Sequence, residues 1–221
     1  MSSVAETAVA IAAGVGGLFG IRAGTEEPRY TLVERVGQIE IRHYGPRLAA
    51  ETTVTGPSME ARSDGFRKVA SYIFGANTAK TSIAMTAPVA QTSLAQMGVA
   101  QKIAMTAPVA QQAAGPDGQW RVQFFMPAKY SRDALPTPND PAVRIVEVPA
   151  QDYAVLRFAG SANGATVTAR TRQLTEGLAH GAWRVSGEPT AWFYDPPWTA
   201  PFLRRNEIAA PVVAAPVVTA R

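Results

Sequence analysis

The chain has 221 residues, of which 47% are hydrophobic and 17% are charged, so it can bury a sizeable core as one large domain or two small ones. Its 21 Lys and Arg against 17 Asp and Glu leave a net charge of only +4, which argues against nucleic acid as a partner. The chain contains no cysteine, which excludes disulfides, thiolate metal sites, thioether-linked cofactors and cysteine nucleophiles.

The N-terminal segment, residues 1–26, contains an apolar run at residues 7–21. This run is shorter than the roughly 20 residues of a spanning helix, and its glycines weaken a helix. It also lacks the preceding basic residues of an export signal. Two interpretations stay open. As an anchor or export signal the run would associate the protein with a membrane or send it out of the cell; otherwise we expect a cytoplasmic protein.

The first half of the folded region reads as two strands followed by a helix. Apolar and polar residues alternate over residues 39–42, and residues 48–54 form a second strand-like run. The helix that follows has Ser58 as its expected N-cap and Gly75 as its C-terminal stop. One apolar face is predicted from the helical spacing of Phe66, Val69, Ala70, Ile73 and Phe74.

The nine residues IAMTAPVAQ occur twice without a change, at Ile83–Gln91 and at Ile103–Gln111. Each copy carries a proline inside an apolar, strand-like run, which predicts an edge strand or an extended rim. Only one copy can take the place of this segment in a single-copy pattern, and the spacing to Trp120 favours the second copy for that place. The first copy would then lengthen a loop or add an edge strand. A tandem duplication without a binding role is the alternative.

The second half repeats the order of the first. Strands are expected at residues 143–148 and 153–158, before a helix that ends at Gly181 and has its apolar stripe at Val167, Leu174 and Leu178. Closing strands are expected at 120–126 and 190–194, and short links between strands favour antiparallel pairing in an α+β fold. We expect a folded domain over residues 27–208, followed by a Pro/Ala/Val-rich tail at 209–221.

Several segments together carry a family resemblance. The runs VERVGQIEIRHYGPRLAAET, GFRKVASYIFGANTA, IAMTAPV, LPTPNDP and DPPWTAPFLRRNEI occur in this order and resemble the SOUL haem-binding protein family over about Pro28 to Val212. The resemblance implies a distorted antiparallel β-barrel of about eight strands with two flanking helices, built as a pseudo-twofold repeat and similar to effector-binding domains. It also implies non-covalent binding of haem b or another tetrapyrrole in an apolar groove near the first helix. The expected role is haem transport, storage or buffering, without enzymatic activity.

Only His43 and His180 offer an imidazole to haem iron. His43 follows Ile39 and Ile41 by steps of two and therefore shares their strand face, whereas Tyr44 takes the other face. His180 stands just before Gly181, where we expect it in solvent at the helix end. His43 is the predicted axial metal ligand. A hydrogen-bonded core histidine, with haem held by apolar contacts alone, is the alternative.

The first helix is the predicted second wall of the groove. Phe66, Val69 and Ile73 would contact the tetrapyrrole, and charge-assisted pairing with propionates is expected of Arg67 and Lys68. The alternative for the three apolar residues is simple core packing, and the alternative for Arg67 and Lys68 is an ordinary solvated helix face. Met105 could touch the porphyrin or pack, and Met85 is the weaker of the two candidates. The predicted binding set is His43, Phe66, Arg67, Lys68, Val69, Ile73 and Met105.

Two other functions stay open beside haem carriage. An interaction module would use the apolar IAMTAPV rim to bind a protein or an amphipathic ligand. A haem-modifying enzyme needs few protein groups of its own. The sequence contains no G-x-S-x-G nucleophile motif, and its two histidines are too far apart for a zinc-binding motif.

Overall fold

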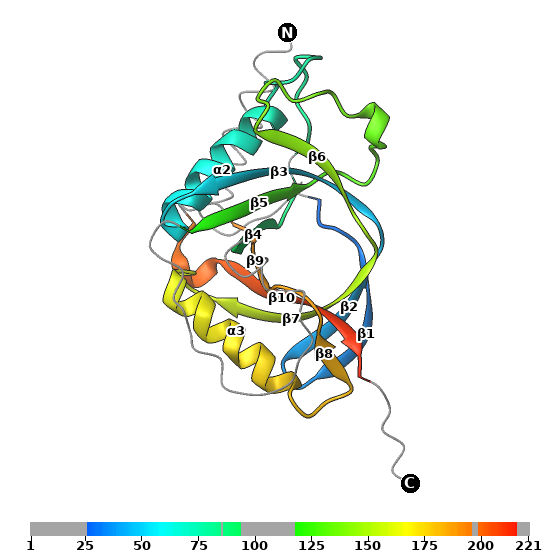
Figure 1. The fold of residues 1–221 in the computed structure, drawn as a ribbon, viewed down its shortest axis with the longest axis vertical. Coiled ribbons are helices and arrows are strands. Elements are labelled where there is room, and N and C mark those ends of the chain that lie inside the picture. The colour runs from blue at the N-terminus through cyan, green and yellow to red at the C-terminus, as the bar shows by residue number, and fades with distance from the viewer. Residues whose placement is uncertain (1–25, 85, 94–117, 196–198, 216–221) are drawn as a thin grey trace.

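The computed structural model describes residues 26–84, 86–93, 118–195 and 199–215. These residues form a ten-stranded sheet with two α-helices on its outside (Figure 1). The predicted α+β class is confirmed. In the described ranges β1 and β6 are the two edges of the sheet and do not pair with each other, so the expected barrel is open rather than closed.

The strands and helices follow one another in two similar series. The first contains β1 (Tyr30–Val36), β2 (Ile39–Tyr44), β3 (Arg47–Thr55), α2 (Ser58–Ile73), β4 (Val89–Ser93) and β5 (Gln119–Phe125). The second contains β6 (Val143–Val148), β7 (Gln151–Ala159), α3 (Gly164–Leu178), β8 (Trp183–Val185), β9 (Thr190–Phe193) and β10 (Arg205–Ala214). Short 3₁₀ turns, η2 (Arg132–Ala134) and η3 (Pro201–Leu203), lie in the loops before β6 and β10.

The strand order shows the predicted pseudo-twofold repeat. From β2 to β6 the order is β2-β7-β10-β9-β4-β5-β3-β6. Exchanging β2 with β6, β3 with β7, β4 with β9 and β5 with β10 returns the same order reversed. The two halves meet where β4 pairs with β9 in the middle of the sheet. The strand β1 and the short β8 are additions to this repeat.

The helices begin and end for local reasons. Pro57 is the N-cap of α2, and the predicted cap Ser58 is instead its first helical residue. Gly75 stops this helix as expected, with a positive φ of 110° that glycine adopts at little cost. Phe74, predicted on the apolar face, is 63% exposed because it lies at the C-cap beyond the last helical turn. Asn163 caps α3, its side chain accepting a hydrogen bond from the Thr166 amide at 2.9 Å.

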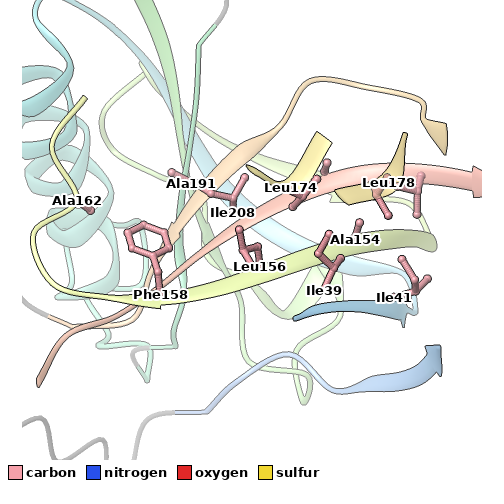
Figure 2. Close-up of a cluster of buried hydrophobic side chains, with 12 residues drawn as sticks. Ile39, Ile41, Ala154, Leu156, Phe158, Ala162, Leu174, Leu178, Ala191 and Ile208 are labelled. Atoms are coloured by element: carbon pink, nitrogen blue, oxygen red, sulfur yellow. The ribbon is translucent and has the colours of Figure 1, made fainter. Parts of the chain in front are cut away.

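Alternation along the strands divides the core into outer and inner parts. The first outer cluster lies between α3 and the sheet and contains Ile39, Ile41, Leu156, Leu174 and Ile208 (Figure 2). A second outer cluster, around Val122 and Phe124, lies beneath α2. The inner faces of both halves meet in a third cluster that contains Tyr44, Phe125, Tyr153, Trp192 and Ala209. Any site between the halves is therefore bounded by these inner side chains.

The last three residues of the first copy, Val89–Gln91, lie in a central strand of the sheet, which corrects the expectation that this copy forms an edge strand or loop. These residues begin β4, which pairs with β5 on one side and β9 on the other. Pro88 precedes the first strand residue, Val89, so its missing N–H removes no bond from the ladder. The second copy, with Met105, and Met85 of the first copy lie outside the described residues.

The chain remains folded beyond the expected boundary at residue 208. Strand β10 runs to Ala214, and Ala209, Ala210 and Val212 are buried. Pro211 is tolerated because, on one side of β10, it lies between the pairing with β9, which ends at Ala209, and the pairing with β8, which begins at Val212. Residues 216–221 and the apolar run 7–21 lie outside the described ranges. Within those ranges, no helix has the length and apolarity needed to cross a membrane.

Candidate functional site

A cavity of about 760 Å³ opens at one end of the inner face. Its walls come from the β2–β3 turn, the segment that follows β5, the β6–β7 turn and the strand-like entry at residues 26–29. The Glu26 carboxylate accepts a hydrogen bond from the Ala128 amide at 2.9 Å, which ties the entry segment to the opposite wall. The apolar part of the lining includes Leu48, Phe125, Met126, Val148, Pro127 and Pro149.

Arg47 is one of the charged residues of this lining. It is the first residue of β3, directly after the Gly45–Pro46 turn. All three of its guanidinium nitrogens are buried and make no hydrogen bond in the described part of the chain. Burial lowers the pKa of Arg47, and the phenols of Tyr153 and Tyr44 offset this electrostatically, although neither supplies a hydrogen bond of ordinary geometry to the guanidinium.

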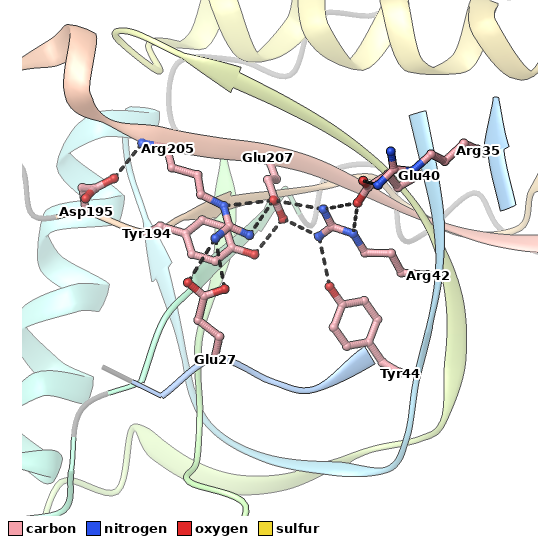
Figure 3. A network of polar contacts seen from close by, with 9 residues as sticks. All are labelled: Glu27, Arg35, Glu40, Arg42, Tyr44, Tyr194, Asp195, Arg205 and Glu207. Carbon is pink, nitrogen blue, oxygen red and sulfur yellow. Dashed lines mark hydrogen bonds and ion pairs between the residues drawn. The ribbon is translucent and has the colours of Figure 1, made fainter. Parts of the chain in front are cut away.

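A second group of charges, centred on Glu207, is fully paired (Figure 3). The Glu207 carboxylate accepts hydrogen bonds from Arg42 Nη1 at 3.0 Å, Arg205 Nη2 at 2.8 Å and the Tyr194 hydroxyl at 2.7 Å. Arg205 also donates to Glu27 at 3.0 Å, so this network ties the entry segment to β10. A smaller cavity of about 270 Å³ lies beside these groups, and in its lining Arg42 pairs with Glu40 and Arg205 pairs with Glu27.

The electrostatics of this network favour its charged form. Burial alone would raise the pKa of Glu207, but Arg42, Tyr194 and Arg205 outweigh it and hold that pKa below its ordinary value. Burial would likewise lower the pKa of Arg42, but Glu207 and Tyr44 raise it. Burial raises the pKa of Tyr44 to about 12 against the opposing effect of Arg42. The network is thus a saturated ion cluster that fixes β2 to β10.

His43 does lie on the same strand face as Ile39 and Ile41, but this is the outer face of the sheet. It stands at the end of β2 with its side chain 48% exposed, and its Nδ1 lies 2.7 Å from an Asp152 carboxylate oxygen. Neither described cavity has His43 in its lining. His180 is exposed just after α3 ends, as expected.

The predicted residues on α2 are separate from His43, because α2 packs on β3 and β5 whereas β2 pairs with β1 and β7. Val69 and Ile73 are fully buried against the sheet, and Phe66 packs partly buried beside Phe124. Arg67 and Lys68 are exposed, and Arg67 pairs with Asp64 one turn earlier. The structure therefore places His43 apart from the predicted residues of α2, whereas Met105 lies outside the described residues, and the binding set stays a prediction.

Sequence reasoning missed the inner-face residues Arg42, Arg47 and Glu207. A usable signal existed for Arg42 and Tyr44, because they alternate with Ile39 and Ile41 and therefore share the face opposite to the outer core. Arg47 and Glu207 carry no comparable local signal. Their partners lie on other strands, such as Phe125 on β5 and Arg42 on β2.

Comparison with solved structures defines the class of fold. The chain shares its fold with the C-terminal domain of EcmrR, at a TM-score of 0.55 and 10% identity over 80% of this chain and 98% of that one. An uncharacterized conserved protein from Listeria innocua gives a TM-score of 0.58 at 8% identity, over 80% and 92% of the two chains. A hydrolase from the same organism gives 0.52 at 8% identity with the same coverage. These likenesses confirm the predicted effector-binding-like α+β fold.

The family follows from the sequence itself. Residues 25–211 match the family model described as SOUL heme-binding protein, and the chain belongs to this family. The predicted resemblance is thereby confirmed. The family is described by ligand binding rather than by catalysis. The comparison with curated proteins gave no match.

Proposed function

We propose that this protein binds haem b or a related tetrapyrrole non-covalently in the 760 Å³ cavity, and that it acts in transport, storage or buffering of that ligand. The observation that carries the proposal is the cavity itself, in a chain of the SOUL family. Its volume lies within the range of roughly 300 to 1,000 Å³ of small-molecule and cofactor sites. Its walls combine an apolar surface with a few placed charges, which suits a flat apolar ring that carries carboxylates.

The lining residues fit the ring and its carboxylates better than they fit a histidine-ligated iron. The described cavity lining contains Tyr130 and Met126, both of types that ligate haem iron, and no histidine. When bound, haem would supply its iron as a Lewis acid and redox centre. Ligation by His43 stays a prediction of a different site, on the outer face at the end of β2.

The test is a titration of the full chain with haemin, followed by absorbance, for the wild type and three variants. Ala128 and Ala134 are both exposed, and of the two only Ala128 lines the cavity. We expect the wild type to saturate at about one equivalent. Ala128→Trp should lower the affinity at least about 10-fold, because an indole in the cavity competes for the space of the ligand. The matched control Ala134→Trp should leave the affinity unchanged.

The third variant, His43→Ala, distinguishes the two sites. A changed Soret band in His43→Ala together with unchanged binding by Ala128→Trp would move the site to the outer face and overturn the cavity proposal. The same titration also separates the remaining functions. A haem-modifying enzyme would consume the band with time, whereas an interaction module without haem would give no saturable shift.

A further inference from the structure

The buried guanidinium of Arg47 lacks a hydrogen-bond partner in the described part of the fold. A buried guanidinium ordinarily obtains carboxylate, carbonyl or water partners, because loss of its hydration is costly. Glu207 and Arg42 show this pattern on the same inner face, since each pairs with the other. No described residue supplies a hydrogen-bond acceptor to the Arg47 guanidinium.

The immediate neighbours of Arg47 are aromatic. Its Cζ atom lies 4.4 Å from the ring centroid of Tyr44, 4.6 Å from that of Phe125 and 5.6 Å from that of Tyr153. Cation–π contacts of this kind hold the planar group through its faces. They leave the N–H groups, which project in the guanidinium plane, without acceptors. The rings therefore position a planar cation for an acceptor that the protein does not provide.

The charge of the cavity indicates what kind of acceptor fits. Its lining contains three arginines and two glutamates, so it carries one excess positive charge. Both glutamates have partners, because Glu26 accepts from the Ala128 amide and Glu147 lies 4.0 Å from Arg132 at the rim. The net positive charge of the lining favours an anionic ligand. Arg47 is the lining arginine whose buried guanidinium nitrogens have no hydrogen-bond partner among the described residues.

We propose that Arg47 receives a carboxylate of the ligand, as a bidentate pair formed when the guanidinium edge turns toward the cavity. This inference rests on the proposed function and deepens it, since it selects flat apolar ligands that carry a free carboxylate. The apolar side chains of Phe125 and Val148 in the same lining accept the ring system beside the charged end. The planar guanidinium matches a carboxylate in geometry as well as in charge.

The test compares protoporphyrin IX with its dimethyl ester, which keeps the ring and loses both carboxylates. Binding to the full chain is followed by porphyrin fluorescence for the wild type, Arg47→Gln, Arg47→Lys and the matched control Arg172→Gln. Arg172 lies on α3 with its side chain 76% exposed and is absent from the cavity lining. We expect Arg47→Gln to weaken binding of the acid about 10- to 100-fold, the range that corresponds to a hydrogen-bonded charge, and to leave binding of the ester unchanged.

Arg47→Lys keeps the positive charge but loses the planar, bidentate donor geometry of the guanidinium. We therefore expect it to recover part of the affinity for the acid that Arg47→Gln loses. Equal affinity of the wild type for acid and ester would overturn the role of Arg47 without any variant and would leave tetrapyrrole binding intact. An equal loss for both ligands in Arg47→Gln would also overturn it, because the effect would then be structural. Failure of the wild type to bind either porphyrin would instead overturn the proposed function.

Discussion

At the scale of single residues, two buried charges on the inner face have opposite roles. Glu207 is fully buried and accepts hydrogen bonds from three side chains, so it stabilises the fold. The guanidinium nitrogens of Arg47 are buried without a hydrogen-bond partner among the described residues, which supports the proposed role of Arg47 in ligand binding. Neither role follows from residue type. It follows from the distances to residues on other strands, which a single sequence does not contain.

The Glu207 network makes a prediction about pH. Replacing Glu207 by Gln leaves Arg42 and Arg205 buried with a weaker partner, and we expect a loss of about 3–5 kcal/mol in the free energy of unfolding at neutral pH. The pKa of Glu207 is lower in the folded state, so its charge stabilises the fold above the ordinary value of 4.5. That contribution disappears as the pH falls below 4.5 and through the folded-state pKa.

Urea unfolding of the wild type and Glu207→Gln between pH 7 and pH 3 checks this. The difference between the two proteins should shrink toward acid pH. The control Glu176→Gln, on the exposed surface of α3, should stay within about 0.5 kcal/mol of the wild type throughout. A constant difference across the whole pH range would show that the loss comes from packing rather than from the carboxylate charge.

At the scale of the elements, the sequence predicted both helices, most strands and the apolar positions of α2 that pack on the sheet. These predictions succeeded because a period of 3.6 or 2 residues is local information. The central place of β4 was missed because Pro88 reads as an edge signal until the strand is seen to begin after it. Strand β10 was missed because a run rich in Ala and Pro carries little β-propensity, and its burial comes from neighbours on β7 and β9.

Two helix glycines lead to a prediction about how closely the helices pack. A Cβ on Gly65 of α2 would lie 2.7 Å from Cβ of the fully buried Val122, whereas a Cβ on Gly177 of α3 would lie 2.7 Å from the terminal Cδ1 of Ile39. Cβ of Val122 is fixed to the backbone, but the end of Ile39 can rotate. We therefore expect Gly65→Ala to lower the free energy of unfolding by about 1–3 kcal/mol through overpacking.

Gly177→Ala is the matched substitution. We expect it to be close to neutral, because the gain in helix propensity of about 1 kcal/mol offsets the adjustment of Ile39. Chemical unfolding of both variants, and of Gly65→Ala in a Val122→Gly background that lacks the clashing Cβ, measures the effect. Equal destabilisation by Gly65→Ala in the wild-type and Val122→Gly backgrounds would contradict the proposed clash.

At the scale of the whole molecule, the repeat places one helix outside each half and leaves the inner faces to meet between the halves. The order of elements predicted this repeat from the sequence. It could not predict that the cavity opens at the β2–β3 and β6–β7 turns, because these turns are brought together by the pairing of β3 with β6. The apolar residues of the predicted groove beside α2 pack the helix on the sheet, and a ligand site there stays a prediction.

The full length of β10 gives a prediction about the extent of the fold. A chain that ends after Ile208 loses the buried residues Ala209, Ala210 and Val212 together with the pairing of β8. We expect it to show no cooperative thermal unfolding, whereas a chain that ends after Ala215 should unfold like the full chain. A cooperative transition at the wild-type temperature in the shorter chain would restore the boundary at residue 208.

The most direct test of the binding account is an amide NMR titration of the ¹⁵N-labelled full chain with protoporphyrin IX, which lacks paramagnetic iron. We expect saturable shifts at the cavity residues Arg47, Ala128 and Val148. The exposed residues Arg67 and Lys68 on α2 should stay unchanged. Shifts at Arg67 and Lys68 without any at Arg47 would contradict the cavity and place the ligand on the first helix instead.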